Sequence, residues 1–410
     1  MSSISQQLQA AGMSMAEADA KARLFSLCPP HHSARAWFVP GRIELLGKHT
    51  DYACGRSLLC AVERGFCVVS APRADDRICL LDARTGSRAG FLIEGAPING
   101  EPPAWARYPA AVALRLRAGG LLGHGADVSF ASDLPSAAGM SSSSAFVVAS
   151  YLALCDAIAP QGRESLAAWL AAAEAGVGTH GGSEDHTAIL CCRAGHWSQY
   201  RFCPPQCEQT IPAPPHLCLV IAVSGVTASK SGAARDAYNR TADSTREILA
   251  LWNQASARRD STVAAALAAA GFEPMAALLP PPLRARLEQF HNESEVWIPA
   301  AVRSAAAGDW QHFGACVAHS QAAAESALAN QIPETIALAA SARRLGALAA
   351  SSFGAGFGGS VWALMPRAQA PAFRAAWQRA YLDAFAARAA ESLFFESAAG
   401  PAALPITLET

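Results

Sequence analysis

The chain has 410 residues, of which 51% are hydrophobic and 16% are charged, and its 32 basic and 33 acidic side chains leave a net charge of −1. This balance, without a run of basic residues, argues against a nucleic-acid or polyanion partner. No uncharged apolar run reaches the roughly 18 residues that cross a bilayer, so no membrane partner is expected either. Two domains are expected, because one hydrophobic core stops growing well below this chain length.

The N-terminal segment and the cysteines bear on where the protein works. Residues 1–28 lack a basic end followed by an apolar core, so they are typical of an amphipathic helix and not of a signal peptide. The chain has 12 cysteines but no C-x-x-C pair, so the spacing of a metal site is absent. The sequence therefore predicts reduced thiols in a cytoplasmic protein.

The sequence of the first half of the chain predicts several strands and three helices. Short runs rich in β-branched and aromatic residues predict strands within 37–79, and a further strand is expected over 126–135. Apolar residues at helical spacing predict helices over 103–118, from 141 to about 158, and over roughly 163–176.

The second half predicts a change of domain and then mostly helices. Prolines are concentrated in segment 203–217, which is the expected connection between domains 1–213 and 214–410. A buried strand follows, then alanine-rich helices, a glycine loop that leads into another strand, a further helix and a last short strand. Because strands and helices are mixed without strict alternation, the expected fold class is α+β.

The strongest local signal is the segment SDLPSAAGMSSSSAFVVAS, in which a loop of small residues leads into an apolar helix that opens with four serines. Small side chains let backbone amides approach an anion, and a helix start offers unpaired N–H groups and a favourable dipole. The hydroxyl groups can add donors or a magnesium ligand. An ordinary helix cap would need only one serine, so the segment favours a phosphate site.

A second loop, SSFGAGFGGSVWAL, places four glycines ahead of a strand. Such dense glycines permit positive φ angles and a close approach of the backbone to a ligand. The alternative is a tight turn between a helix and a strand. Two loops of this kind in one chain favour a nucleotide site.

Three segments, PGRIELLGKHTDYACG, LPSAAGMSSSSA and GAGFGGS, resemble in order and spacing the three motifs of the GHMP small-molecule kinases. The first is most similar to the galactokinase signature, in which G-R-x-N-L-I-G-E-H-x-D-Y precedes a glycine and an apolar strand. WARY, GGSEDHTAIL and SGAARDAYNR extend the resemblance over nearly the whole chain. The resemblance implies two α+β domains with the active site in the cleft between them, and transfer of a phosphoryl group from ATP to the anomeric hydroxyl of a galactose-type sugar.

The resemblance also implies the nucleotide-binding residues and a Mg²⁺ cofactor. The residues implied to hold the nucleotide are Gly139, Ser141, Ser142, Ser143, Gly354 and Gly356, and Ser143 is the implied magnesium ligand. No string marks the adenine pocket, so the preferred purine is left open.

The catalytic aspartate of the family lies in a G-I-M-D-Q string, which matches residues 182–186 here. The resemblance thus makes Asp185 the base for the attacking hydroxyl and Arg42 the cation that stabilises it and the migrating phosphoryl group. An arginine lowers the pKa of a neighbouring aspartate and keeps it ionised. By themselves, Asp185 would be read as a helix cap and Arg42 as a solvated charge. Glu184 and His186 depart from the family string, and their part in the chemistry is left open.

The implied sugar-binding residues are Lys48, His49, Asp51, Gly182 and Tyr238. Lys48 stands where the family has a glutamate toward the C6 end of the sugar. An ammonium group donates hydrogen bonds and carries positive charge, so it suits an acceptor or an anion. Galactose and galacturonate, whose C6 carboxylate Lys48 would bind, are therefore both candidates. Otherwise Lys48 pairs with Glu44 or Glu184, or reaches the nucleotide phosphates.

Other functional alternatives follow from the same motifs. The chain could be a sensor that binds sugar and ATP without catalysis, although an intact Asp185 and Arg42 favour an enzyme. Kinases of mevalonate, homoserine or heptose phosphates share the superfamily, but GKHTDY is similar to the sugar-recognition segment. The sugar itself, including N-acetylgalactosamine, is left open, and we expect a monomer or a weak homo-oligomer.

Overall fold

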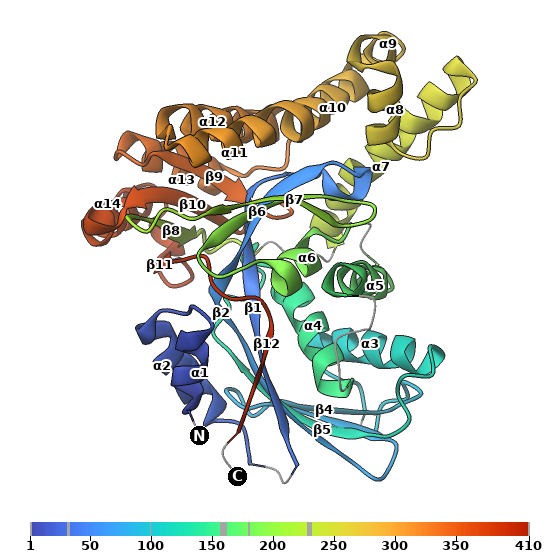
Figure 1. Ribbon diagram of the computed structural model, residues 1–410, viewed down its shortest axis with the longest axis vertical. Helices are drawn as coiled ribbons and strands as arrows, with labels where there is room; N and C mark the ends of the chain where they lie inside the picture. The colour runs from blue at the N-terminus through green and yellow to red at the C-terminus, as the bar shows by residue number, and fades with distance from the viewer. Residues whose placement is uncertain are drawn as a thin grey trace.

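The computed structural model describes residues 2–30, 33–98, 100–155, 162–178, 181–227 and 232–408, which form two β-sheets with helices packed against them (Figure 1). Strands and helices do not alternate strictly along the chain, so the predicted α+β class is confirmed. The two sheets and the helices beside them contribute to one large hydrophobic core.

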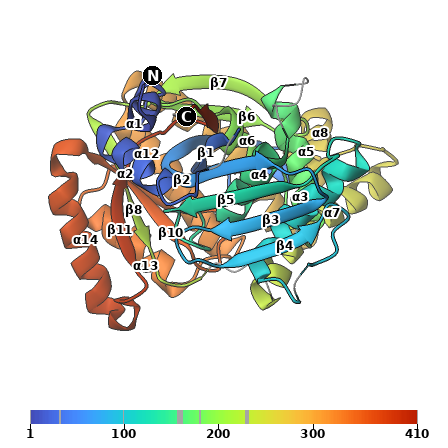
Figure 2. The same ribbon diagram turned by 90° about the horizontal axis from the view of Figure 1, so that it is seen from below.

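The larger sheet has eight strands. They are β1 (Arg35–Leu46), β2 (Arg56–Pro72), β3 (Arg77–Asp82), β4 (Arg88–Leu92), β5 (Ala126–Ser132), β6 (His196–Arg201), β7 (Gln206–Pro212) and β12 (Leu404–Ile406). Their order is β12-β1-β2-β5-β3-β4, and β6 joins the N-terminal end of the long strand β2 and carries β7 (Figure 2). Strands β1 and β2 are buried on both faces, which explains their nearly continuous apolar sequences.

Helices cover both faces of this sheet (Figure 1). One face carries α3 (Arg107–Ala118), α4 (Ser142–Leu154), α5 (Arg163–Ala175) and α6 (Glu184–Cys191). Helix α4 is apolar around its whole circumference after the first turn, as expected for a helix buried between a sheet and other helices. The other face carries α1 (Ile4–Ala10) and α2 (Met15–Phe25), which pack against β1 and β2.

The smaller sheet has the strand order β11-β8-β10-β9. Its strands are β8 (Leu217–Val223), β9 (Ala349–Phe353), β10 (Ser360–Pro366) and β11 (Leu393–Ser397). Helices α13 (Pro333–Arg344) and α14 (Ala370–Ala384) pack on one face of this sheet, where Trp377 of α14 is fully buried. Helices α11 (Ile298–Ala307) and α12 (Trp310–Ser326) belong to the large core, to which α12 contributes Phe313.

A helical extension lies between β8 and α11 in the chain. It consists of α7 (Gly232–Ser256), α8 (Val263–Ala270), α9 (Phe272–Ala276) and α10 (Pro281–His291). Helix α10 continues through a π-helical segment, Asn292–Trp297, into α11. The extension has its own small core, and Phe290 of that core lies against Gly55, just after the turn that follows β1.

Most predicted elements are present, but two segments differ from expectation. The segment 203–217 is not a linker, because Gln206–Pro212 forms β7 and pairs with β6 in a hairpin. In addition, β12 returns from the C-terminal end to pair with β1. The division into domains 1–213 and 214–410 stays a prediction, and β12 crosses it.

The cysteines also differ from expectation. Cys54 and Cys203 form a disulfide although they are 149 positions apart, so the prediction of reduced thiols is wrong for this pair. The sequence could not reveal the pair, because only the fold brings the start of β2 next to the end of β6. Within the described residues, no helix is both long and apolar enough to cross a membrane.

Candidate active site

A cavity of about 560 Å³ lies between the larger sheet with its helices and the loop that follows β9 of the smaller sheet. It is lined by residues of the larger sheet and its helices, by Tyr238 of α7, and by Gly354 and Ala355 of the loop between β9 and β10. Of the residues predicted for a site, those on its lining are Arg42, His49, Asp51, Gly139, Ser141, Ser142, Ser143, Gly182, Asp185, Tyr238 and Gly354. The structure therefore brings together segments that are up to 312 positions apart, from Arg42 to Gly354.

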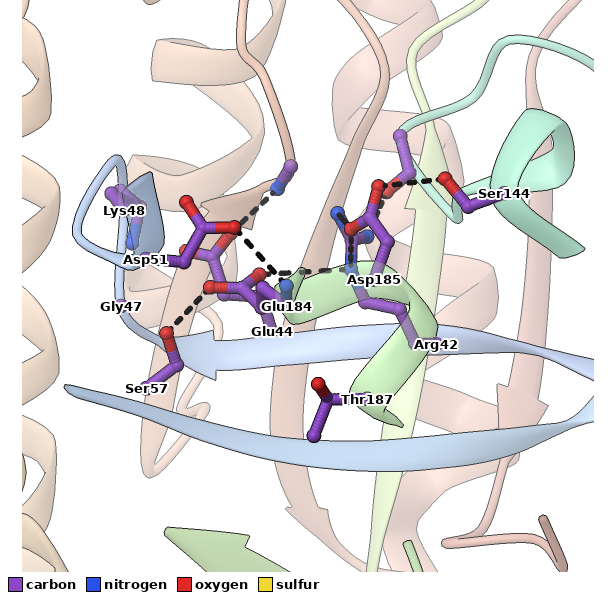
Figure 3. A network of polar contacts seen from close by, with 12 residues as sticks. Arg42, Glu44, Gly47, Lys48, Asp51, Ser57, Ser144, Glu184, Asp185 and Thr187 are labelled. Atoms are coloured by element: carbon purple, nitrogen blue, oxygen red, sulfur yellow. Dashed lines mark hydrogen bonds and ion pairs between the residues drawn. The ribbon is translucent and has the colours of Figure 1, made fainter. Parts of the chain in front are cut away.

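Arg42 and Asp185 form a direct ion pair in this cavity (Figure 3). Alternation along β1 points Ile43 into the core and Arg42 toward the cavity. The Nε and Nη2 atoms of Arg42 donate to Asp185 Oδ1 at 2.9 and 2.7 Å. Asp185 lies in the first turn of α6, after the cap residue Ser183. It is therefore not a helix cap, and Arg42, with 4% of its side chain exposed, is not a solvated charge.

The charge of Arg42 is stabilised by carboxylates around it. Burial by itself would lower the pKa of the guanidinium, but Asp185, Glu184 and Glu44 together raise it above its ordinary value. Arg42 also donates to the carbonyl oxygen of Gly139. The guanidinium thus connects the phosphate loop to the candidate base.

A serine and a second carboxylate lie behind Asp185. Ser144 Oγ donates to Glu174 Oε2 at 2.7 Å and also lies 3.1 Å from Asp185 Oδ2. His186 Nε2 lies 3.2 Å from the same Glu174 oxygen. Glu174 and His186 both line the cavity, so they belong to the site, and no motif in the sequence had indicated Glu174.

The loop before α4 has the backbone conformation of an anion site. Ala137, Gly139 and Ser141 have φ angles of 49°, 76° and 56°. A Cβ atom on Gly139 would lie 2.9 Å from the carbonyl oxygen of Phe353, so this position requires glycine. No side chain caps α4, so the N–H groups of its first turn are available to a ligand. The predicted serines Ser141, Ser142 and Ser143 line the cavity around them.

The second glycine loop contributes only part of what was predicted. Gly354 has a φ angle of 81° and lines the cavity. Gly356 is not on the lining, because it packs against Asn330, whose carbonyl oxygen would lie 2.3 Å from an added Cβ atom. The glycine at 356 thus serves the packing of the loop, and its predicted contact with the nucleotide is not supported.

The turn after β1 holds His49 in a neutral form. His49 has a φ angle of 58°, and its Nδ1 and Nε2 atoms lie 2.8 Å from the Tyr52 hydroxyl and 3.1 Å from the Ala355 carbonyl oxygen. The carbonyl fixes Nε2 as the donor, so Nδ1 accepts from Tyr52. Burial and then the charge of Arg286 lower the pKa of His49 to about 3. Arg286 of α10 in turn donates to the His49 carbonyl at 2.7 Å.

Asp51 and Gly182 are packed directly against each other. Asp51 accepts from the backbone N–H groups of Tyr52 at 2.8 Å and of Glu184 at 3.1 Å, which fixes the turn against α6. An added Cβ atom on Gly182 would lie 2.4 Å from Asp51 Oδ2, so a side chain here would displace the aspartate. Tyr238 lies over His49, with a ring-centroid distance of 5.2 Å.

Lys48 does not face the cavity, although it lies next to His49 in sequence. Its side chain is 1% exposed, and Nζ donates to Ser320 Oγ of α12 at 3.1 Å. Gly47 explains the direction, because its φ angle of 130° turns the chain sharply between the strand and the motif. A direct contact between Lys48 and a sugar, or with nucleotide phosphates, is thus not supported by the structure.

Glu44 and Glu184, which the motifs did not assign to the sugar, line the cavity together with Asp51 (Figure 3). Burial raises the pKa of Glu44 to about 7, against the opposing effect of the Lys48 and Arg42 charges. Burial, Glu44 and Asp51 raise the pKa of Glu184 well above its ordinary range. Glu184 Oε2 accepts from Ser57 Oγ, and Oε1 lies 3.8 Å from Arg42.

An aromatic cluster lines the opposite end of the cavity. Phe146 stacks on Phe66 with ring centroids 5.2 Å apart and contacts Phe130 at 4.7 Å, and Trp105 packs edge-on against Phe130. The sequence had offered no adenine pocket, because these rings come from β2, β5, α4 and the segment before α3. A flat apolar surface of this kind suits the face of a purine base.

Comparison with known families defines the class of protein. Residues 107–193 match the family described as GHMP kinases N terminal domain, and residues 298–383 match GHMP kinases C terminal. Residues 30–72, which contain Arg42 and the turn after β1, match the galactokinase galactose-binding signature. The fold and these matches define a GHMP kinase.

Individual relatives narrow the class further. The chain is 30% identical over 358 residues to a galactokinase of Roseiflexus sp. (strain RS-1), covering 87% of this chain and 88% of that protein. It is also 30% identical to a galactokinase of Chloroflexus aurantiacus, covering 89% and 90% of the two chains. The crystal structure of Lactococcus lactis galactokinase complexed with galactose shares the fold, with a TM-score of 0.81 at 22% identity over 94% of this chain and 98% of that one. The chain belongs to the galactokinase family and is a sugar kinase of that type.

Solved structures of other GHMP kinases are less similar. The mevalonate kinase of Methanococcus jannaschii superposes with a TM-score of 0.54, over 90% of this chain and 99% of that one. The predicted preference for a sugar kinase over a kinase of mevalonate is therefore confirmed by the relatives and their family.

Proposed function

We propose that the protein transfers the γ-phosphoryl group of ATP to the anomeric hydroxyl of galactose or a closely related uncharged hexose. The observation that carries this proposal is the Arg42–Asp185 pair, which lies beside the start of α4 in a cavity with room for both a sugar and a nucleotide. Phosphoryl transfer needs little covalent chemistry from a protein and much positioning and charge neutralisation, which this arrangement supplies.

In the proposed reaction, Asp185 accepts the proton of the anomeric hydroxyl as its oxygen bonds to the γ-phosphorus. The bond from that phosphorus to the bridging oxygen of ADP breaks, and the sugar 1-phosphate and ADP leave. Arg42 keeps Asp185 ionised and lies close to the charge that develops on the phosphoryl group. The amides at the start of α4, with Gly139 and the serines, hold the remaining phosphates.

The oxygen atoms at the phosphate end fit a Mg²⁺ ion. Ser143 and Glu174 both line the cavity there, and Mg²⁺ prefers oxygen ligands and retains waters and phosphate oxygens. Within the described residues, no cluster of three or more His, Cys, Asp or Glu could hold a metal by itself. When bound, the ion would neutralise charge on the phosphates.

We favour an uncharged sugar over galacturonate on electrostatic grounds. Carboxyl groups of Asp51, Glu44 and Glu184 line the sugar end of the cavity, while the amine of Lys48 bonds to Ser320. A carboxylate on the substrate would therefore lie beside the carboxyl group of Asp51, without a contact to Lys48.

The proposal is tested by measuring ADP release with galactose, N-acetylgalactosamine, galacturonate and mevalonate in the presence of Mg²⁺. We expect turnover with galactose and none with mevalonate, and galacturonate should be used poorly. A clear preference for galacturonate would overturn the electrostatic argument. Absence of ADP release with all four, together with thermal stabilisation by galactose and ATP, would instead identify a sensor.

A further inference from the structure

Lys48 is a buried cation that the proposed reaction does not use. Its amine donates to Ser320 Oγ at 3.1 Å, and Ser320 Oγ donates to Glu293 Oε1 at 2.9 Å. A buried ammonium group is tolerated only where carboxylates and hydrogen-bond acceptors compensate its charge. Ser320 thus connects Lys48 to the first of two carboxylates.

Glu293 fixes the turn from which Lys48 projects. It is fully buried in the π-helical segment 292–297, and its Oε1 atom accepts from the backbone N–H groups of Gly47 at 2.8 Å and Lys48 at 3.4 Å. Its Oε2 atom has no hydrogen-bond partner in the described part of the chain. One carboxylate of the C-terminal half therefore holds the turn that precedes His49.

Glu44 is a second buried carboxyl group in this region, on β1. It is 3% exposed, and its Oε2 atom accepts from the N–H group of Gly354 at 3.2 Å, across the two halves of the cavity. Among the described residues Oε1 has no hydrogen-bond partner. Arg42, the other cation near Glu44, is bonded to Asp185 and Gly139. Glu44 thus joins β1 to the loop that carries Gly354.

The sequence around these residues departs from the galactokinase signature at three positions, and two of the departures change charge. Glu44 stands at the asparagine of G-R-x-N-L-I-G-E-H, and Lys48 stands at its glutamate. Together they keep one carboxyl group on the strand and add a cation beneath it.

We propose that Lys48, Ser320 and Glu293 form one buried network that positions the sugar end of the cavity, with Lys48 as a positioning residue that does not touch the sugar. Through the N–H groups of Gly47 and Lys48, the network holds the turn that leads to His49, which lines the cavity. It therefore sets the affinity for the sugar and leaves the rate of phosphoryl transfer to Arg42 and Asp185. This inference rests on the proposed function, because sugar binding is its readout.

The test uses the Lys48→Met variant, with galactose affinity measured by calorimetry and turnover by ADP release. We expect the Kd for galactose to rise about tenfold or more, since the loss of one partner leaves buried charge uncompensated beside the sugar turn. The kcat should stay within about threefold, because Arg42 and Asp185 keep their contacts. In Lys48→Met/Glu293→Gln the excess charge is removed while Oε1 can still accept from the N–H group of Gly47, so the Kd should return to within about threefold of the natural protein.

Lys21 offers a matched control. It is also fully buried and pairs with Glu17 and Asp133, but it lies on α2, on the face of the sheet opposite the cavity helices. Lys21→Met should destabilise the protein and leave the Kd for galactose within about twofold, because its loss does not touch the cavity.

Each outcome decides between the two ideas. If the natural protein neither binds nor phosphorylates galactose, the proposed function fails, and this inference fails with it. If the natural protein is active and Lys48→Met binds galactose as Lys21→Met does, only the charge network is overturned. Should Lys48→Met not fold, the double variant decides: recovery of folding and galactose binding supports the network, and failure of either overturns it.

Discussion

Two groups of buried charges lie next to each other along β1, and they are compensated differently. Arg42 bonds directly to Asp185, and both line the cavity. Lys48 reaches the carboxylate of Glu293 through Ser320, and it is not on the cavity lining. A directly paired charge on a cavity wall can act on a ligand, whereas a compensated charge beneath the wall can only position what lies above it.

The largest expected effect concerns the base of the first group. Asp185→Asn keeps the shape of the side chain but cannot accept the proton, so turnover should fall by about a thousandfold. The Kd for galactose should change by less than about threefold, because the sugar turn is untouched. ADP release and calorimetry measure the two effects. A variant that keeps more than a tenth of its turnover would show that Asp185 is not the base.

The next effect concerns the cation of the same group. Arg42→Met should lower the free energy of unfolding by about 3–5 kcal/mol, because Asp185, Glu184 and Glu44 would all lose their shared partner. Urea denaturation of the variant and of the natural protein measures the difference. A loss below about 1 kcal/mol would mean that the pair contributes little to folding.

A smaller effect is expected from the cross-link beside Asp51. Cys54, three residues after Asp51, is bonded to Cys203, and Cys203 is exposed to reductants. Cys203→Ser should lower the free energy of unfolding by about 2–4 kcal/mol through loss of the loop constraint. Dithiothreitol should lower the Tm of the natural protein to about the Tm of Cys203→Ser. If the reductant leaves the Tm unchanged while the bond is shown to be open, the cross-link has no stabilising role.

The smallest effect is a pH dependence that arises from Glu44 on β1. The pKa of Glu44 is raised to about 7, so the folded state holds a proton that the unfolded state has released. Its contribution to stability is present below the unfolded pKa and is lost as the pH rises through about 7, by on the order of 2 kcal/mol. Glu44→Gln should therefore lose less stability than the natural protein between pH 5 and pH 8. Denaturant midpoints at both pH values provide the measurement, and parallel losses in the two proteins would contradict it.

Local sequence patterns predicted much of the fold and of the phosphate end. Helix α5 begins at the predicted residue, and α3 and α4 lie within their predicted ranges. The serine-rich helix start lines the cavity as predicted, because a loop of small residues and a helix N-terminus are features of consecutive residues. The prediction of a linker at 203–217 was wrong, because Gln206–Pro212 pairs with β6 despite the prolines around it.

The sequence by itself determined the family, the α+β class and most of the motif residues that meet in the cavity, because these follow from motifs within short stretches and from their order. Only the tertiary structure decided where Lys48 points, which carboxyl group it reaches through Ser320, and that Gly356 packs away from the cavity. It also brought Cys54 to Cys203 and assembled the aromatic end of the cavity. The direction of a side chain after a sharp turn, and the partners of a buried charge, depend on elements far apart in the chain, and no local pattern records them.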